Sequence, residues 1–353
     1  MGPWPRRLGL AIMAGAVLGV IAVAGFFHAF DRPGALTGHV VLVVPKGAGV
    51  GTIGELLERH GVIASANVFK LGVRLTGNHG RLRAGEYDFP GPISARGAMA
   101  VLIAGKTVVR RLTLPEGITT ARAVALINAG YGLVGALAPI AQEGTLLPDT
   151  YHYQYGDTRA QLVGRMTRAL TAELQRLWKT RARALPLGSP REAVILASMV
   201  ERETARADER PMIAGVFVNR LRRGMALQSD PTVAYGVALR EQAPGGVLRR
   251  ALTRADLAAP GDFNTYLNKG LPPGPISNPG RAALAAVLDP ALTKALYVVA
   301  DGKGGHAFAR TLKEHNRNVR RWRKLRKNRL APTAPSAGPS SGAATASPWP
   351  RRR

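Results

Sequence analysis

Two glutamates, Glu201 and Glu203, end a mostly apolar run in the segment AVILASMVERETARADER and are the clearest candidates for chemistry in the sequence. On a helix, two residues turn the chain by about 200°, so the two carboxyls point to opposite sides and cannot act as a pair. The side of Glu203 carries Leu196, Met199 and Val200, which are bulkier than the residues on the side of Glu201. We therefore expect Glu203 to lie in the more apolar surroundings.

Apolar surroundings predict a raised pKa for the Glu203 carboxyl, because burial disfavours the charged form. A carboxyl that stays protonated can give its proton to a leaving oxygen, which makes Glu203 a candidate general acid. The alternative is structural, since both acids could pair with nearby arginines such as Arg202 or Arg206. The pattern alone leaves both interpretations open.

A helix over residues 189–204 must position both acids, and its start is well marked in the sequence. Ser189 is a candidate N-cap, Pro190 suits the first helical position, and Glu192 completes an S-x-x-E capping box. A second helix is expected over residues 211–223.

Residues 224–280 are rich in Gly, Pro, Asn and Asp, which predicts ordered loops. A helix (RAALAAVLD), a strand (ALYVVAD) and a final helix follow. One narrow face of the final helix carries Leu312, His315, Val319, Trp322 and Leu325. Residues 330–353 form a tail of Ala, Pro, Ser and basic residues, which predicts disorder.

Residues 39–111 are predicted to form a small α+β unit. Strand-like runs (HVVLVVP, LRAGEYDFP and VVRRLTLPEG) alternate with helical segments, one of which ends at Gly61 and another at Gly105. A further helix is expected around Ala66–Leu75. From residue 119 to 185 the pattern is helical, interrupted by the loop GTLLPDTYHYQYG.

An apolar run, LGLAIMAGAVLGVIAVAGFFHAF, occupies residues 8–30 and is long enough to cross a bilayer. It is too long for the apolar region of a cleaved signal peptide, and no convincing cleavage site follows it. Because Arg6 and Arg7 precede the run, the positive-inside rule places residues 1–7 in the cytoplasm and everything after Phe30 outside. The alternative is a buried helix of a soluble protein.

The composition excludes several classes of protein. The 353 residues include no cysteine, which excludes disulfide scaffolds, thiol nucleophiles, zinc–thiolate sites and iron–sulfur sites. The seven histidines form no i,i+4 pair, so no metal site is expected. The formal net charge is +27, with 13 bases against one acid in residues 310–353. Such a charge suits nucleic acid, anionic lipid or an acidic polymer, and its sign does not choose between them.

Residues 49–54, GVGTIG, match the G-x-G-x-x-G pattern of dinucleotide sites. That pattern requires an acid about 20 residues later, at the end of a second strand. Residues 62–78 contain no acid and look helical. We therefore interpret the pattern as a Gly-rich turn from strand to helix, and no cofactor is expected.

The longer motifs resemble one family, the endolytic murein transglycosylases of the MltG/YceG type. The matching stretches are ILASMVERETA, GVFVNRLRRGMALQSDPTVAYG, FNTYLNKGLPPGPISNPG, YVVADGKGGHAF and EGTLLPDTYHY. VVPKGAGVGTIGELL and LRAGEYDF are similar to the family's small LysM-like module. The resemblance covers about residues 40–324, and the motifs follow one another in the same order as in the family. The basic C-terminal end lies outside the family core.

The resemblance implies an α+β fold in several parts. These are a cytoplasmic N-terminus (1–7), a transmembrane helix (8–30), a LysM-like module (39–111), a larger, mainly helical catalytic domain (112–329) with a lysozyme-like active site, and the tail (330–353). It also implies a single-pass inner-membrane protein whose catalytic domain is periplasmic. The implied enzyme is a lytic transglycosylase, a carbon–oxygen lyase. It would cut β-1,4 bonds from N-acetylmuramic acid to N-acetylglucosamine within glycan strands, leave 1,6-anhydro ends, and so terminate nascent strands.

In the family's E-x-E-T motif the second glutamate is the catalytic acid, and it falls on Glu203 here. Glu201 then becomes a structural or secondary acid. Amide, hydroxyl and aromatic groups suit sugar rings, and an arginine suits a lactyl or peptide carboxylate. The substrate-binding candidates are Asn219, Arg220, Gln228, Asp230, Thr232, Tyr235, Asn264, Thr265 and Tyr266. For each of them the alternative role is loop scaffolding.

Peptidoglycan strands are the expected substrate, and peptidoglycan synthases in the membrane are the expected protein partners. No nucleic-acid partner is expected, because no recognisable binding motif accompanies the basic charge. The main alternative is a non-catalytic peptidoglycan-binding scaffold of the cell-wall synthesis machinery. The intact ERET and SDPTVAYG motifs argue against it.

Overall fold

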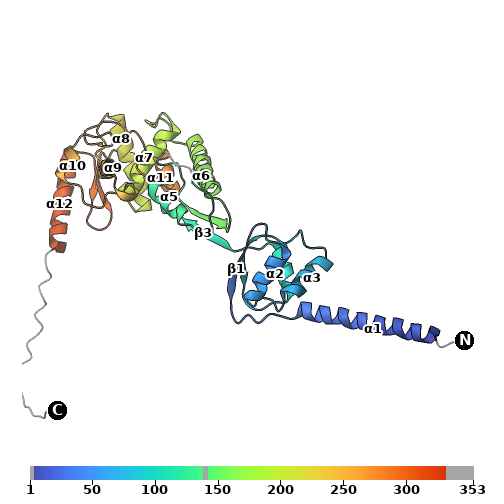
Figure 1. The fold of residues 1–353 in the computed structure, drawn as a ribbon. Helices are drawn as coiled ribbons and strands as arrows, with labels where there is room; N and C mark the ends of the chain where they lie inside the picture. The colour runs from blue at the N-terminus through green and yellow to red at the C-terminus, as the bar shows by residue number, and fades with distance from the viewer. Residues whose placement is uncertain (1–3, 138–141, 331–353) are drawn as a thin grey trace, which may run out of the picture.

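The computed structural model describes residues 4–137 and 142–330, and Figure 1 shows them as one long helix followed by two folded units. The helix is α1 (Trp4–Asp31). Its segment Leu8–Asp31 is predominantly apolar and is long enough to cross a membrane. From residue 331 onwards, the predicted tail lies outside the described residues.

The first folded unit has the order β-α-α-β-α. Its elements are β1 (Val40–Val44), α2 (Val50–Arg59), α3 (Ala66–Leu75), β2 (Gly85–Phe89) and α4 (Ala95–Ala104). β1 and β2 pair antiparallel, with Val40 opposite Phe89. Gly61 and Gly105 follow α2 and α4 with φ of +72° and +66°, as expected for left-handed helix ends.

The third predicted strand pairs outside this unit. β3 (Val109–Thr113) is antiparallel to β4 (Thr150–Gln154), which lies within the stretch that the sequence predicted as a loop. Both strands bury a single residue, Leu112 and Tyr153, in a core shared with α5 and α6. That shared core explains why β3 joins the second unit, although its sequence is continuous with the first.

The second unit contains the remaining elements. They are α5 (Thr120–Asn128), α6 (Arg159–Lys179), α7 (Pro190–Glu203), α8 (Arg210–Arg222), α9 (Asp230–Arg240), α10 (Arg254–Ala258), α11 (Arg281–Leu288), β5 (Tyr297–Ala300), β6 (His306–Ala309) and α12 (Leu312–Leu330). Two single-turn 3-10 helices, Ala207–Glu209 and Pro244–Gly246, lie between them. β5 pairs antiparallel with β6, and α12 packs against this hairpin.

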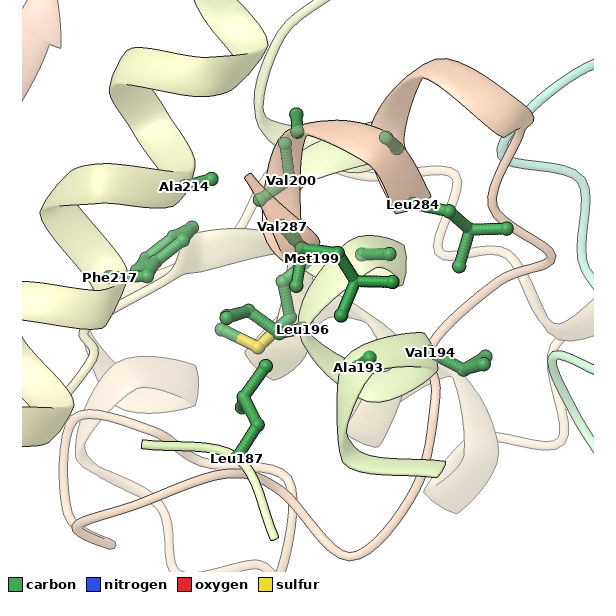
Figure 2. Close-up of a cluster of buried hydrophobic side chains, with 14 of the residues drawn as sticks. Leu187, Ala193, Val194, Leu196, Met199, Val200, Ala214, Phe217, Leu284 and Val287 are labelled. Carbon is green, nitrogen blue, oxygen red and sulfur yellow. The ribbon is translucent and has the colours of Figure 1, made fainter. Parts of the chain in front are cut away.

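Helix α7 runs through the centre of this unit. Its residues 193–201 are all buried, as expected for a helix that is apolar on every side. Figure 2 shows its side chains packed between those of α8 and α11, for example Leu196 and Met199 near Phe217 and Val287. The end of α7, where Glu203 lies, is therefore held by a well-packed core.

The N-terminus of α7 differs in one detail from the predicted capping box. The Ser189 side chain accepts a hydrogen bond from the Glu192 N–H at 3.3 Å, as expected. The Glu192 carboxylate, however, accepts from the Gly188 N–H at 2.7 Å rather than from the Ser189 N–H. Both bonds satisfy backbone N–H donors at or just before the helix start, so the start of α7 is still well defined.

The prediction of loops over residues 224–280 was incomplete, because α9 and α10 lie within them. Pro231 sits in the first turn of α9, where a missing N–H breaks no helical hydrogen bond. The Pro and Gly content that suggested loops thus marks a helix start in this part of the chain.

Candidate active site

A pocket of about 310 Å³ opens at the C-terminal end of α7, and Glu203 is part of its lining. The other lining residues are Val216, Phe217, Arg220, Leu227, Gln228, Asp230, Tyr266, Tyr297, Val298, Leu312 and His315. They come from α8, the segment that leads into α9, the loop after α10, β5 and α12, so distant parts of the sequence line one pocket. A larger pocket of about 720 Å³ lies beside α8, and none of the described residues that line it is a glutamate.

The Glu203 carboxyl has one side-chain hydrogen bond, in which Ser229 Oγ donates to Glu203 Oε2 at 3.2 Å. Burial raises the pKa of Glu203 above its ordinary value, and the negative charge of Asp230 adds to this shift. The Ser229 hydrogen bond and the positive charges of His306 and Arg220 oppose it. The net shift makes the protonated acid more populated than in a free glutamate, and this is the form that a proton donor needs.

The Glu201 carboxyl has quite different partners. Arg210 Nη2 donates to it at 2.7 Å, and the Gly280 N–H donates at 2.9 Å. Arg210 also binds Glu116 at 3.0 Å, so Glu201 belongs to a buried ionic network. Burial raises the pKa of Glu201 as well, while Gly280 and Arg210 act against that shift. The partners therefore separate the two acids, whereas the direction of the pKa shift does not.

Arg220 lies in the pocket wall, but most of its donors are already used. Its Nε donates to the Leu296 carbonyl at 2.6 Å, and its Nη1 donates to Leu227 O at 2.9 Å and to Gln228 Oε1 at 3.1 Å. The guanidinium also lies 5.3 Å from the ring centroid of Tyr297. These contacts hold the wall together and differ from the open, bidentate carboxylate site that the sequence suggested.

Gln228, Asp230 and Tyr266 also line the pocket. Gln228 has φ of +51°, a left-handed conformation that is uncommon for a residue with a side chain and that often marks functional sites. Because its Oε1 accepts from Arg220, its amide nitrogen points elsewhere. Tyr266 donates its hydroxyl to Asp230 Oδ1 at 2.6 Å, so this phenol and carboxylate act as one unit.

The other substrate-binding candidates lie outside the pocket lining. Asn219 donates to the Thr293 and Ala295 carbonyls at 2.8 and 3.0 Å, and Asn264 donates to the Leu257 and Ala259 carbonyls. These side chains fasten loops to one another. Such contacts correspond to the scaffolding role that the sequence left open.

Thr232, Thr265 and Tyr235 are likewise used internally. The Thr232 and Thr265 hydroxyls lie 2.9 Å apart, and Thr265 accepts from the Ser229 N–H. Tyr235 packs edge-on against Phe263 and donates to Glu143 at 3.4 Å. The two threonines therefore fix Ser229, which in turn contacts Glu203.

Sequence reasoning missed several residues of the pocket. Ser229 stands between two named candidates in QSDPT, so its hydroxyl could have been considered with them. Tyr297 and His315 could not have been found from the sequence. Their rings stack, with centroids 5.2 Å apart, only because β5 and α12 pack together. The final helix, α12, thus forms part of the pocket wall.

Two curated proteins are similar to this chain in sequence. The endolytic murein transglycosylase of Bacillus subtilis (strain 168) is 29% identical over 305 residues, which cover 78% of this chain and 82% of that protein. The endolytic murein transglycosylase of Streptococcus pneumoniae serotype 2 is 28% identical over 329 residues, which cover 80% of this chain but 58% of that protein.

A solved structure of a yceG-like protein from Listeria monocytogenes is 28% identical, with a TM-score of 0.48, and the match covers 80% of this chain and 99% of that one. The model of the YceG-like family matches residues 42–321, from β1 in the first unit into α12 in the second. Because this match takes in both folded units, the chain belongs to the YceG-like family.

Proposed function

We propose that the protein is a membrane-anchored lytic transglycosylase that cuts murein glycan strands internally. The observation that carries the proposal is the placement of Glu203 in a pocket where burial favours its protonated form. The two relatives named endolytic murein transglycosylase support the choice of murein as substrate. The bond cut is the β-1,4 bond from N-acetylmuramic acid to N-acetylglucosamine.

The reaction needs only one acid that also serves as a base. The Glu203 carboxyl gives its proton to the glycosidic oxygen, and the bond from that oxygen to C1 of the muramic acid breaks. The resulting Glu203 carboxylate accepts the proton of the muramic acid C6 hydroxyl, while the oxygen of that hydroxyl forms a bond to C1. The product has a 1,6-anhydro end, no water is consumed, and Glu203 regains its proton.

The neighbouring groups prepare the acid and hold the sugar. Ser229 fixes one carboxyl oxygen of Glu203, while Arg220 fixes the wall that carries Gln228. The free amide nitrogen of Gln228 is suited to donate to an acetamide carbonyl of the substrate. The aromatic faces of Tyr266 and Tyr297 are suited to pack against sugar rings.

Hydrolysis is the second candidate, and one observation favours it. Asp230 lines the same pocket as Glu203, and most glycoside hydrolases use two carboxylates, one of which activates a water or attacks the sugar. Against this, the Asp230 carboxylate accepts the Tyr266 hydroxyl at 2.6 Å and begins helix α9. These contacts suit a positioning group better than a base.

The remaining parts of the proposal concern location and partners. Helix α1 anchors the chain in the inner membrane, with both folded units on the periplasmic side. The β-α-α-β part of the first unit is LysM-like. Cutting strands near the membrane would terminate their elongation, which makes peptidoglycan synthases the natural partners. A non-catalytic scaffold would not need a carboxyl that lines an open pocket and has a single side-chain hydrogen bond.

The test is digestion of purified sacculi followed by mass spectrometry of the muropeptides. Internal anhydro ends are expected from the parent protein and none from Glu203→Gln. Products that each carry one added water would instead show a hydrolase and would call for the same test on Asp230→Asn. Intact sacculi after treatment with the parent protein would support the scaffold alternative.

A further inference from the structure

The C-terminal end of α1 packs directly against the first folded unit. Phe30 is buried, and its ring lies against Gly72 of α3 so closely that no Cβ would fit there. Asp31 accepts from Arg96 Nε at 2.6 Å, and the Arg96 guanidinium lies 5.0 Å from the Phe30 ring centroid. The direction of α1 therefore fixes the orientation of α3.

The length of α1 places this contact at the membrane surface. At 1.5 Å per residue, about 20 residues from Leu8 onward cross the hydrocarbon core of roughly 30 Å, which reaches Phe27. Phe30 lies one helical turn further, so Gly72 and the rest of α3 lie at the level of the lipid headgroups. Figure 1 shows α3 at the end of the unit from which α1 departs.

The outer face of α3 is unusually apolar for a surface helix. Leu71 and Leu75 are 46% and 67% exposed, and they lie four residues apart on the same side. The opposite side buries Phe69, Gly72 and Val73 in the core. The exposed leucines are thus left without a partner among the described residues of the chain.

The charge around these leucines has one sign. Residues 59–85 contain no Asp or Glu, and the five bases among them are Arg59, Lys70, Arg74, Arg81 and Arg83. A helix with exposed leucines and flanking bases is typical of elements that lie in the interface of anionic bilayers. The acid nearest to the α1 junction, Asp31, is already paired with Arg96.

We infer that α3 is a second membrane contact, in which Leu71 and Leu75 insert into the outer surface of the bilayer that α1 spans while the bases meet anionic headgroups. The inference rests on the proposed anchoring of α1. As a consequence, the first unit lies directly on the membrane, and the face that carries α3 cannot contact peptidoglycan.

The test uses single-cysteine variants of the full chain, which label uniquely because the sequence contains no cysteine. Leu75→Cys, Ala16→Cys within α1, and Leu292→Cys on a fully exposed loop of the second unit each receive an environment-sensitive fluorophore. Each variant is placed, one chain per disc, in nanodiscs of phosphatidylglycerol and phosphatidylcholine. One copy per disc removes contacts between chains.

A water-soluble quencher is expected to act on the Leu75 label with a quenching constant roughly fivefold lower than on the Leu292 label, because interfacial burial restricts access. Equal quenching at Leu75 and Leu292, with the Ala16 label protected, would overturn the inference and leave the anchor intact. An unprotected Ala16 label would refute the anchor itself, and with it the inference. Murein digestion is measured separately and depends on neither result.

Discussion

Replacing each of the two glutamates by glutamine should have opposite consequences for chemistry and for stability. Glu203→Gln keeps the shape of the side chain and the hydrogen bond to Ser229 but removes the transferable proton. General acid–base catalysis contributes about 10²- to 10⁴-fold to a rate, so the variant should lose at least this much, about 3–5 kcal/mol of transition-state stabilisation.

The same substitution should not destabilise the fold at neutral pH. Because burial raises the folded-state pKa of Glu203, its stabilising effect is full below the unfolded pKa and is lost as the pH rises through the folded pKa. Each unit of that shift corresponds to about 1.4 kcal/mol. Glu203→Gln should therefore melt at or above the parent temperature at pH 8 and close to it at pH 4.

Glu201→Gln should show the reverse pattern. It weakens a buried ion pair in which Arg210 is only 6% exposed, although Glu116 remains as a second partner of that arginine. Removing one member of a buried pair costs about 3 kcal/mol, which lowers Tm by about 6–12 °C for a unit of this size. The cleavage rate of the folded fraction should fall far less than in Glu203→Gln.

The assay combines thermal unfolding with the rate of anhydro-muropeptide release from sacculi. Glu192→Gln is the matched control, because Glu192 lies on the same helix and its side chain binds only the Gly188 N–H at the surface. An inactive Glu201→Gln beside an active Glu203→Gln would show that the wrong acid was chosen. Full activity of both variants would refute the single-glutamate mechanism.

Three further predictions follow from other contacts. Ser229→Ala removes a hydrogen-bond donor that stabilises the Glu203 carboxylate, so the pKa of Glu203 should rise further. The alkaline limb of the pH–rate profile should therefore move to higher pH. An unchanged limb would contradict the assigned hydrogen bond. Gly72→Ala should lower stability by about 1–3 kcal/mol through its clash with Phe30, measured by denaturant unfolding, while Gly51→Ala in open space on α2 should not destabilise. Arg110→Ala should cost about 3 kcal/mol in the same assay because it leaves the 2% exposed Glu86 unpaired, and a loss below about 1 kcal/mol would show that Glu86 finds another partner.

The sequence predicted those elements whose signals are local. The start of α7 at Ser189 and Pro190, the helix ends at Gly61 and Gly105, and the apolar α1 follow from caps, turns and hydropathy. These features depend on residues within one or two turns of each other. Local physics is sufficient for them.

What the sequence missed depends on contacts between distant segments. The partner of β3 lies about 40 residues further on, and only the shared core of Leu112 and Tyr153 selects it. The substrate-binding candidates were chosen by residue type, which does not tell a pocket-facing amide such as Gln228 from a buried clamp such as Asn264. The wall contributed by Tyr297 and His315 exists only once β5 and α12 have packed together.

A series of specific contacts leads from α1 to the second unit. Phe30 packs on Gly72, which joins α1 to the first unit. The Glu86 carboxylate in β2 accepts from the Arg110 guanidinium at 2.7 and 2.6 Å, which joins the first unit to β3. The first of these contacts is buried and the second is bidentate.

The series continues to the candidate acid through Glu201. Shortly after β3, Glu116 binds Arg210, and Arg210 binds Glu201, two residues before Glu203 on α7. Through Arg210 and Glu116, Glu201 therefore connects the end of α7 to the segment after β3, the strand that leads back to the first unit. Specific contacts therefore lie at each step between Glu203 and the end of α1. If α1 spans the membrane and the protein cuts murein as proposed, these contacts predict that the cut falls within a limited range of heights above the bilayer.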